Sequence, residues 1–321
     1  MKAIVQDHYG NATSLRFDDI DPPTVGDDKV LVQVVAAGVD RGALHFMTGQ
    51  PYLMRLGTGL RTPKVRVPGV SYAGRIEAIG SNVTGYSVGD EVYGAARGAY
   101  AEYVGASPTK MAHKPAQLTF EQAAVLPYAA FVGLQAVSDH GRVQPGERVL
   151  VVGATGAVGS VVLQAAKAAG ANVTAITGPR NQQIATNLGA DHTIDYTRAD
   201  FTDGPRTYDV IIDVFGATPT RRLQRALTPR GRLIIAGGEG DRWIGGIQRQ
   251  LGAILLNPFI GQTLRMFLAK ENTDTLQHMN DLIAAGKVQP PQTHSHPLIE
   301  AANAVAALEE ASSPGRLALT I

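Results

Sequence analysis

Residues 149–159 read Val149-Leu-Val-Val-Gly-Ala-Thr-Gly-Ala-Val-Gly159, an apolar run that enters a glycine-rich turn. The run predicts a buried strand, and the residues that follow have helical periodicity. The turn carries Ala154-x-Gly156-x-x-Gly159, the dinucleotide-binding fingerprint with alanine at its first position. Glycines let backbone N–H groups approach a pyrophosphate, and the following helix directs the positive end of its dipole at that charge. We therefore expect a dinucleotide to be bound by Ala154, Thr155, Gly156, Ala157, Val158 and Gly159.

The segments around the fingerprint alternate between strand-like and helix-like patterns. Strands are predicted at 148–152, 172–177, 192–195, 209–214 and 232–236, and helices near 157–169 and 181–188. Parallel neighbours need a crossover, which a helix provides, so this alternation predicts an α/β, doubly wound parallel sheet. A phosphate-binding loop of the nucleotide hydrolases would end in Gly-Lys-Ser/Thr, whereas this loop ends in Gly159-Ser160.

The end of the second strand favours NADPH over NADH. An NAD site usually carries Asp or Glu about 20 residues past the glycines, where the acid binds the ribose hydroxyls. Here the strand ends at Thr177 and is followed by Gly-Pro and Arg180. Arg180 can form a charge-assisted bond to a 2′-phosphate, and Thr177 can donate its hydroxyl. We also expect Tyr196, Phe215 and Gly237 in the cofactor site.

The first part of the chain has a different pattern. Short β-rich runs at 3–5, 30–37, 74–79, 91–93 and 101–104 are separated by Gly and Pro, which predicts a mostly antiparallel, barrel-like unit. Thr119 is a predicted N-cap, and 123–140 has a helical pattern interrupted by Pro127. Near the C-terminus, helices are predicted at 274–285, ending at Gly286, and at 298–310. A final strand at 316–321 is expected to return to the first unit.

Composition limits the function classes. The chain has 321 residues, net charge +1 and no cysteine. The absence of cysteine excludes disulfides, thiolate zinc sites, iron–sulfur clusters and a cysteine nucleophile. The balanced charge predicts neither a nucleic-acid nor a membrane partner, so a small-molecule ligand is expected. The longest apolar stretch, 123–137, contains Pro127 and Gln135 and is shorter than the roughly 20 residues of a membrane span, and no signal segment is evident, so a cytoplasmic protein is expected.

Further motifs occur in the same order along both predicted units. They are 68–69, 73–74, 77–80, 88–92 (Val-Gly-Asp-Glu-Val), 126–131 (Leu-Pro-Tyr-Ala-Ala-Phe), 143–149, 164–171 and 188–196. With them the chain resembles the zinc-independent medium-chain dehydrogenases/reductases of the quinone oxidoreductase type over nearly its whole length. The resemblance implies a discontinuous catalytic domain, barrel-like (GroES-like), at 1–122 and 272–321, and a Rossmann domain at 123–271. It also implies an active site between the domains and a homodimer.

The zinc ligands of related dehydrogenases are replaced. Where zinc-dependent relatives carry a cysteine, this chain has Asp40, and where they carry a His-Glu pair, it has Val70-Ser71. His294 and His296 are interpreted as exposed loop residues in a proline-rich segment. We therefore expect no metal site.

Without zinc, hydride addition to a quinone or an α,β-unsaturated carbonyl is the easier reaction, and a hydrogen-bond donor would stabilise the developing anion. Tyr52 and Tyr128 are the candidate donors. Asp40, where the quinone reductases often carry Asn, is a candidate for bonding nicotinamide or substrate. The stretch 237–261 resembles the family's variable segment that shapes the substrate pocket.

Two other functions stay open: a zinc-independent aldehyde or ketone reductase, and a non-catalytic NADPH-binding protein. A short-chain reductase is disfavoured, since no Tyr-x-x-x-Lys pair occurs. The physiological substrate, the proton donor, the strictness of the NADPH preference and the oligomeric state are not determined by sequence.

Overall fold

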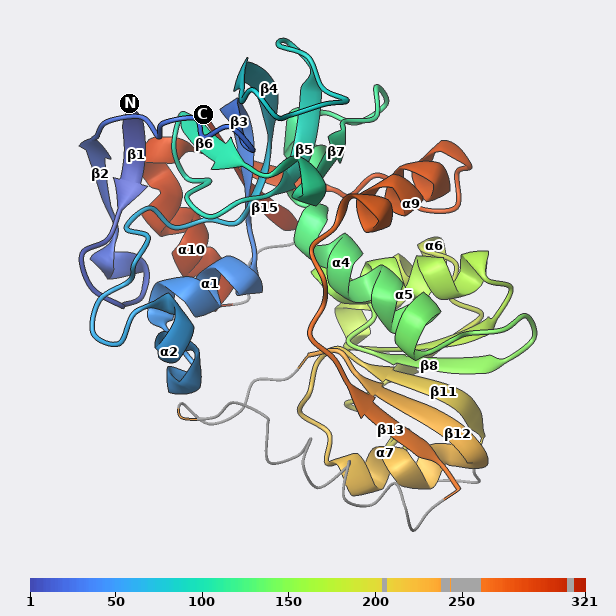
Figure 1. The fold of residues 1–321 in the computed structure, drawn as a ribbon. Helices are drawn as coiled ribbons and strands as arrows, with labels where there is room; N and C mark the ends of the chain where they lie inside the picture. Colours follow the sequence, from blue (N-terminus) through green and yellow to red (C-terminus); the bar gives the residue numbers. More distant parts are fainter. Residues whose placement is uncertain (204–206, 238–242, 244–260, 311–314) are drawn as a thin grey trace. The chain divides into compact units, whose positions relative to one another are not determined.

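The computed structural model describes residues 1–321 except 204–206, 238–242, 244–260 and 311–314 (Figure 1). The chain divides into two compact units. The first consists of Met1–Tyr128, Glu271–Asn280 and Pro290–Ile321, and the second of Ala129–Lys270 and Asp281–Gln289. No described helix is long and apolar enough to cross a membrane.

The first unit is built on a mostly antiparallel sheet. Its strands follow the order β14-β15-β3-β4-β5-β7, with β6 paired to β3. Their bounds are β3 (Val30–Val39), β4 (Ser71–Ile79), β5 (Glu91–Ala95), β6 (Tyr103–Ala106), β7 (Met111–His113), β14 (Thr293–Pro297) and β15 (Arg316–Thr320), while β1 (Lys2–Val5) and β2 (Arg16–Asp19) form a separate antiparallel pair. In β3, Val30, Val32 and Val34 are buried between more exposed neighbours, the alternation of a strand with one face on a core.

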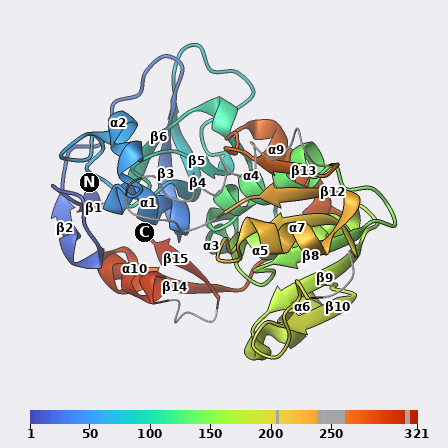
Figure 2. The same cartoon turned by 90° about the horizontal axis from the view of Figure 1, so that it is seen from below.

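The predicted return of the last strand is confirmed. β15 pairs antiparallel with β3, with Leu317 opposite Val39 and Thr320 opposite Ala36. β14 then adds parallel to β15 (Figure 2). His294 and His296 therefore lie on an edge strand, and their interpretation as loop residues was wrong, because pairing with β15 overrides the weak strand propensity of this polar, proline-flanked stretch.

Helices and short turns complete the first unit. They are η1 (Ala12–Ser14), α1 (Arg41–Thr48), η2 (Tyr52–Met54), α2 (Arg55–Thr58), η3 (Pro108–Lys110), α3 (Phe120–Ala124), η7 (Leu298–Glu300) and α10 (Ala301–Glu309). Thr119 caps α3, as predicted: its side chain accepts from the Gln122 N–H, and the Gln122 side chain accepts from the Thr119 N–H.

The predicted helix at 123–140 is divided. α3 ends at Ala124, α4 (Pro127–Gln135) begins at Pro127, and a π-helical turn, η4 (Ala136–His140), follows. Proline is favoured in the first turn of a helix, where its missing N–H costs no bond, and it cannot continue the helix before it. Pro127 therefore starts a new helix.

The second unit contains a six-stranded sheet in which every pairing is parallel. Its order is β10-β9-β8-β11-β12-β13. The bounds are β8 (Arg148–Val152), β9 (Asn172–Thr177), β10 (His192–Asp195), β11 (Tyr208–Asp213), β12 (Leu227–Ile235) and β13 (Thr263–Met266), with α5 (Ala157–Ala168), η5 (Pro179–Asn181), α6 (Gln182–Asn187) and α7 (Thr220–Ala226). Figure 1 shows α4 and α5 on one face of the sheet and α7 on the other. The predicted doubly wound sheet is confirmed, and its order reverses between β8 and β11, where such sheets bind ligands.

The helix α9 (Thr273–Ala284) crosses from one unit to the other along the chain, and Gly286 follows it with φ +67°, the predicted C-cap glycine. Asp281–Gln289 belongs to the second unit, although the sequence placed 272–321 in the first. The Gln289 N–H donates to Gln164 Oε1 on α5 at 2.8 Å, and Gln289 Nε2 donates to the Asn187 carbonyl at 3.2 Å. These bonds to side-chain and backbone atoms attach residues 281–289 to the second unit. Because their partners are more than 100 residues away in the chain, the sequence of 281–289 does not reveal them.

Candidate active site

The glycine turn after β8 has the geometry that its sequence predicted, with one addition. Gly153, directly after the strand, has φ +82°, a conformation that a side chain makes costly. It supplies the tight turn that the first fingerprint glycine usually supplies. Sequence reasoning assigned that position to Ala154, which is buried and whose N–H donates to the Ile176 carbonyl at 3.4 Å. The sequence pattern that indicates this role for Gly153 is its place directly after the apolar run 149–152.

Gly156 and Gly159 are needed for different reasons. A Cβ atom on Gly159 would lie 2.0 Å from the Gly153 carbonyl oxygen, so only glycine lets α5 pack this closely on the turn. On Gly156 the nearest atom to a Cβ, again the Gly153 oxygen, is 3.5 Å away, an ordinary contact. Among the residues that the structure describes, the space at Gly156 is therefore open, as a ligand cradle requires.

The start of α5 suits an anion. Gly156 is the N-cap, and because glycine has no side chain it leaves the first-turn N–H groups without a capping bond of its own. These groups have no partner within a helix, and together with the helix dipole they favour a phosphate. Of the other predicted residues here, Ala157 is exposed, Thr155 is half-buried and Val158 is buried. The turn thus fits the pyrophosphate of a dinucleotide.

The end of β9 forms a second part of this edge. Thr177 is buried, and its hydroxyl donates to the Gly178 carbonyl at 2.7 Å. Arg180 is exposed on η5, and within the described residues its guanidinium has no hydrogen-bond or ion-pair partner. A Cβ on Gly178 would lie 3.3 Å from the Tyr196 hydroxyl, so Tyr196 lies beside this loop. The structure brings Thr177, Arg180 and Tyr196 together, with the Thr177 hydroxyl directed at the backbone.

Phe215 and Gly237 lie at the ends of the next strands. Phe215 is 66% exposed, and a Cβ on Gly153 would lie 3.1 Å from its Cβ. A Cβ on Gly237 would lie 2.2 Å from the Val214 carbonyl oxygen. The predicted cofactor residues after β8, β11 and β12 are therefore neighbours at one edge of the sheet. The rest of the stretch 237–261, except Trp243 and Gly261, lies outside the described residues.

Asp40 is held by two hydrogen bonds in the first unit. It is the N-cap of α1, where Oδ1 accepts from the Ala43 N–H at 2.8 Å, and Oδ2 accepts from Ser71 Oγ at 2.9 Å. Burial raises the pKa of Asp40, and the bonds from Ala43 and Ser71 oppose that rise. Asp40 and Ser71, both named in the sequence as residues in place of zinc ligands, are thus joined by a hydrogen bond. The sequence named Ser71 only as one of the residues in place of a His-Glu pair, and gave no sign that it bonds to Asp40.

Tyr128 lies next to Asp40. A Cβ on Gly42 would lie 2.8 Å from Tyr128 Cε2 and 3.1 Å from Asp40 Oδ1, so the ring and the carboxylate flank the same glycine. Burial, followed by the negative charge of Asp40, raises the pKa of Tyr128 to about 12. The phenol therefore keeps its proton at neutral pH and can donate a hydrogen bond.

Tyr52, the other candidate donor, begins η2, and the guanidinium carbon of Arg55 lies 4.4 Å from its ring centre. It belongs to a different group of side chains from Asp40 and Tyr128, although all three lie in the first unit. Within the described residues no group of three or more His, Asp or Glu side chains is placed to hold a metal ion.

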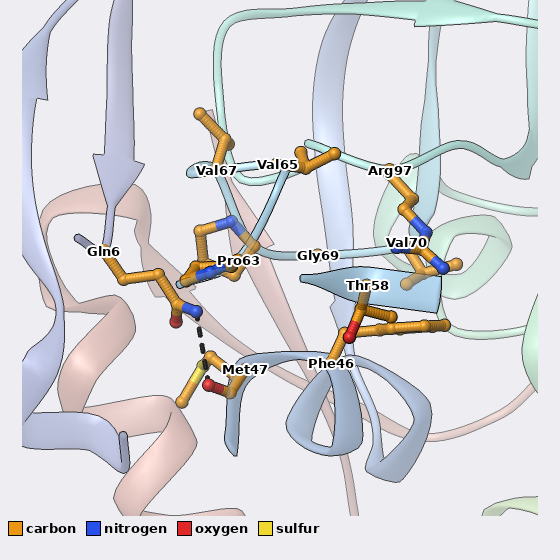
Figure 3. Close-up of a pocket in the computed structure, with 11 residues that line it drawn as sticks. Gln6, Phe46, Met47, Thr58, Pro63, Val65, Val67, Gly69, Val70 and Arg97 are labelled. Atoms are coloured by element: carbon orange, nitrogen blue, oxygen red, sulfur yellow. Dashed lines mark hydrogen bonds between the residues drawn. The ribbon is translucent and has the colours of Figure 1, made fainter. Parts of the chain in front are cut away.

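The first unit also contains a pocket (Figure 3). Some of its lining residues, such as Thr58 and Val70, lie close in sequence to Tyr52 and Ser71. It is a small, partly open hollow with a cavity volume of about 20 Å³, room for about one water molecule. Its lining includes Gln6, Phe46, Met47, Thr58, Val70 and Arg97. Gln6 Nε2 donates to the Met47 carbonyl at 3.2 Å, and the Arg97 guanidinium lies 3.9 Å from the Phe46 ring centre. The wall is mostly apolar.

Comparison with known families matches both parts of the chain. Residues 26–116 match the alcohol dehydrogenase GroES-like domain. Residues 188–319 match the family described as zinc-binding dehydrogenase.

Relatives and solved structures agree with these matches. The chain is 31% identical to the NADPH-dependent alkenal/one oxidoreductase, chloroplastic, of Arabidopsis thaliana, over 90% of this chain and 71% of the relative. It is 30% identical to the quinone oxidoreductase of Homo sapiens, over 75% of this chain and 74% of the relative. The quinone oxidoreductase structure from Coxiella burnetii superposes with a TM-score of 0.86 at 27% identity, covering 100% of this chain and 99% of that one. The chain belongs to the medium-chain dehydrogenase/reductase superfamily, within its quinone oxidoreductase-like family.

Proposed function

We propose that the protein is an NADPH-dependent oxidoreductase that transfers hydride to a quinone or an α,β-unsaturated carbonyl without zinc. The observation that carries the proposal is the open cradle at Gly156 before the uncapped N-terminus of α5. When bound there, NADPH supplies the hydride. The relatives named for quinone and alkenal/one reduction support the substrate class.

Different residues of the second unit would bind different parts of the cofactor. The first-turn N–H groups of α5 would bind the pyrophosphate. Arg180, exposed and without a described partner, would bind a 2′-phosphate, and Tyr196 would flank the same loop. Phe215 and Gly237 would border the cofactor at the ends of β11 and β12. Because β9 ends in Thr177 and not in an acid, nothing at this position repels a phosphate.

The residues of the first unit would act on the substrate oxygen. As hydride arrives, negative charge develops on that oxygen, and a protonated phenol can stabilise it by donating a hydrogen bond. Tyr52 and Tyr128 are the proposed donors, and Asp40 would orient nicotinamide or substrate. Asp40, Val70 and Ser71 replace the zinc ligands, and Ser71 instead donates to Asp40. In this proposal a tyrosine that donates a hydrogen bond to the substrate oxygen would stabilise its negative charge, as zinc does in the zinc-dependent relatives.

The proposal extends to organisation and location. We propose that 1–122 with 272–321 is the catalytic domain, apart from Asp281–Gln289, which packs with the second unit, and that 123–271 is the cofactor domain. We also propose that the protein works as a homodimer in the cytoplasm. Among the described residues β13 is the last strand of its sheet, and Met266 on it is 37% exposed. Such an edge can pair with a second copy.

The test is loss of NADPH absorbance in the presence of quinones, enones and aldehydes, with a strong chelator throughout. We expect turnover with quinones and enones. Turnover with aldehydes alone would indicate a carbonyl reductase, and tight NADPH binding without turnover of any electrophile would indicate a non-catalytic protein; either result would replace the proposed function.

A further inference from the structure

Arg55 lies between two aromatic rings. Its guanidinium carbon is 4.4 Å from the centre of the Tyr9 ring and 4.4 Å from the centre of the Tyr52 ring. Arg55 Nε also donates to the Gly49 carbonyl at 3.0 Å, and a terminal nitrogen donates to the Thr48 carbonyl at 3.2 Å. The planar guanidinium thus contacts rings with its faces and the end of α1 with its N–H groups. A lysine could not make all of these contacts, since its ammonium is a point charge.

Tyr9, one of the two rings beside Arg55, is itself fixed by hydrogen bonds. The Tyr9 hydroxyl donates to the Gly59 carbonyl at 2.8 Å and lies 2.9 Å from Thr58 Oγ1. Gly49, the left-handed C-cap of α1 with φ +61°, leaves room for the rings: a Cβ there would lie 2.6 Å from Tyr9 and 2.7 Å from Arg55 Nε. Tyr9 is therefore a fixed support for Arg55.

Tyr52 lies in a short turn that follows α1. It begins a three-residue turn, and the next side chain, Leu53, is 47% exposed. A turn of this length has few backbone bonds of its own. The face of the Tyr52 ring lies against Arg55, which in turn is fixed to α1 and Tyr9.

We propose that Arg55 is a positioning residue that orients the Tyr52 ring for hydrogen-bond donation to the substrate oxygen. The Tyr9 hydroxyl also bonds to Thr58, which lies in the wall of the pocket shown in Figure 3, so the same contacts connect the proposed donor to the pocket wall. The inference rests on the proposed function in giving Tyr52 the donor role. Its structural half, the orientation of Tyr52 by Arg55, does not depend on activity.

The structural half is tested by ¹⁹F NMR of protein labelled with 3-fluorotyrosine. The chain has ten tyrosines, and the resonance missing from Tyr52→Phe assigns Tyr52. Arg55→Met keeps the length of the side chain and removes its charge and donors. We expect it to shift and broaden the Tyr52 resonance, with a smaller change in Arg55→Lys. The matched control is Arg75→Met, which removes another stacked arginine, 4.7 Å from the Phe120 ring centre. A Tyr52 resonance unchanged in Arg55→Met would overturn the proposal.

The catalytic half is tested by enone and quinone turnover in Arg55→Met, Tyr52→Phe and the double variant. We expect Arg55→Met to lower kcat for enones about tenfold, within the range for a lost transition-state bond, with quinone kcat and NADPH affinity nearly unchanged. In the Tyr52→Phe background the same change should have no further effect, because the group it positions is gone. Arg55→Lys should restore part of the rate.

The two failures are distinguishable. If Tyr52→Phe itself spares enone turnover, the donor role in the proposed function fails, whatever the NMR result for Arg55. If Tyr52→Phe is selective for enones but Arg55→Met acts additively with it, or lowers both substrates equally, the positioning role fails and the donor role stands.

Discussion

The carbonyl oxygen of Gly153 lies 2.0 Å from the point where a Cβ on Gly159 would be, and 3.5 Å from the corresponding point on Gly156. Gly159→Ala should therefore destabilise the protein by about 3 kcal/mol or more, since the clash is with backbone that cannot rotate away. Gly156→Ala should change stability by less than about 1 kcal/mol and weaken NADPH binding roughly tenfold or more, because the methyl group occupies the cradle. Denaturant unfolding and NADPH titration of the two variants separate the roles. Equal losses of stability would contradict this division.

Arg180→Ala should narrow the preference for NADPH over NADH. Arg180 is exposed after β9 and has no partner among the described residues, so the variant loses only its bond to the 2′-phosphate. The loss should be about 1–3 kcal/mol for NADPH and near zero for NADH. Titration of both cofactors measures it, with Arg198→Ala as a control on another exposed arginine of the same unit. Equal affinity for the two cofactors in the unmodified protein would remove the basis of the prediction.

Strong chelators should leave activity and stability unchanged. The chain has no cysteine, and Asp40 and Ser71, which we propose stand in place of two zinc ligands, are bonded to each other. Turnover and thermal unfolding with and without chelator, together with metal analysis of protein purified without an affinity tag, check this. Stoichiometric zinc would refute it.

Asp40→Asn should stabilise the protein increasingly as pH rises above about 4. Burial raises the pKa of Asp40 from 3.8, so its contribution to stability is present below the unfolded pKa and is lost as pH rises through the folded value. Asparagine keeps an oxygen for the Ala43 N–H and carries no charge. The difference in Tm between variant and wild type should therefore be small in acid and larger at pH 7. A difference that shrinks with rising pH would show that Asp40 is stabilised as the anion.

Tyr52→Phe should lower enone turnover roughly 10- to 1,000-fold, as losses of single transition-state hydrogen bonds do. Quinone turnover should fall much less, because water can protonate the anion that forms. NADPH affinity should be nearly unchanged, since Tyr52 lies in the first unit and the predicted cofactor residues lie in the second. Tyr128→Phe, measured beside it, identifies the donor if Tyr52→Phe retains full rates with both substrates.

Local patterns in the sequence were enough to predict the cofactor unit. The bounds of β8 and β9 agree with the prediction, because a buried strand is encoded by its own apolar residues. The bounds of β10 also agree, although that strand is only partly buried. The N-cap at Thr119 and the C-cap at Gly286 depend on neighbours within one turn and were predicted for the same reason. Each of these features depends on residues close together in the chain, and the folded protein keeps the local structure that they favour.

Tertiary structure alone decided the features that join distant residues. Asp40 and Ser71 are 31 positions apart, and Gln164 and Gln289 are 125 apart, so no window of sequence contains either pair. β14 is polar and became a strand only because β15 offers it a paired edge. Arg55 meets Tyr9 only after α1 and the end of β1 have packed into the first unit. The sequence by itself thus determined the architecture and the cofactor turn, whereas the orientation of the candidate catalytic side chains came from long-range packing, whose partners a local pattern does not specify.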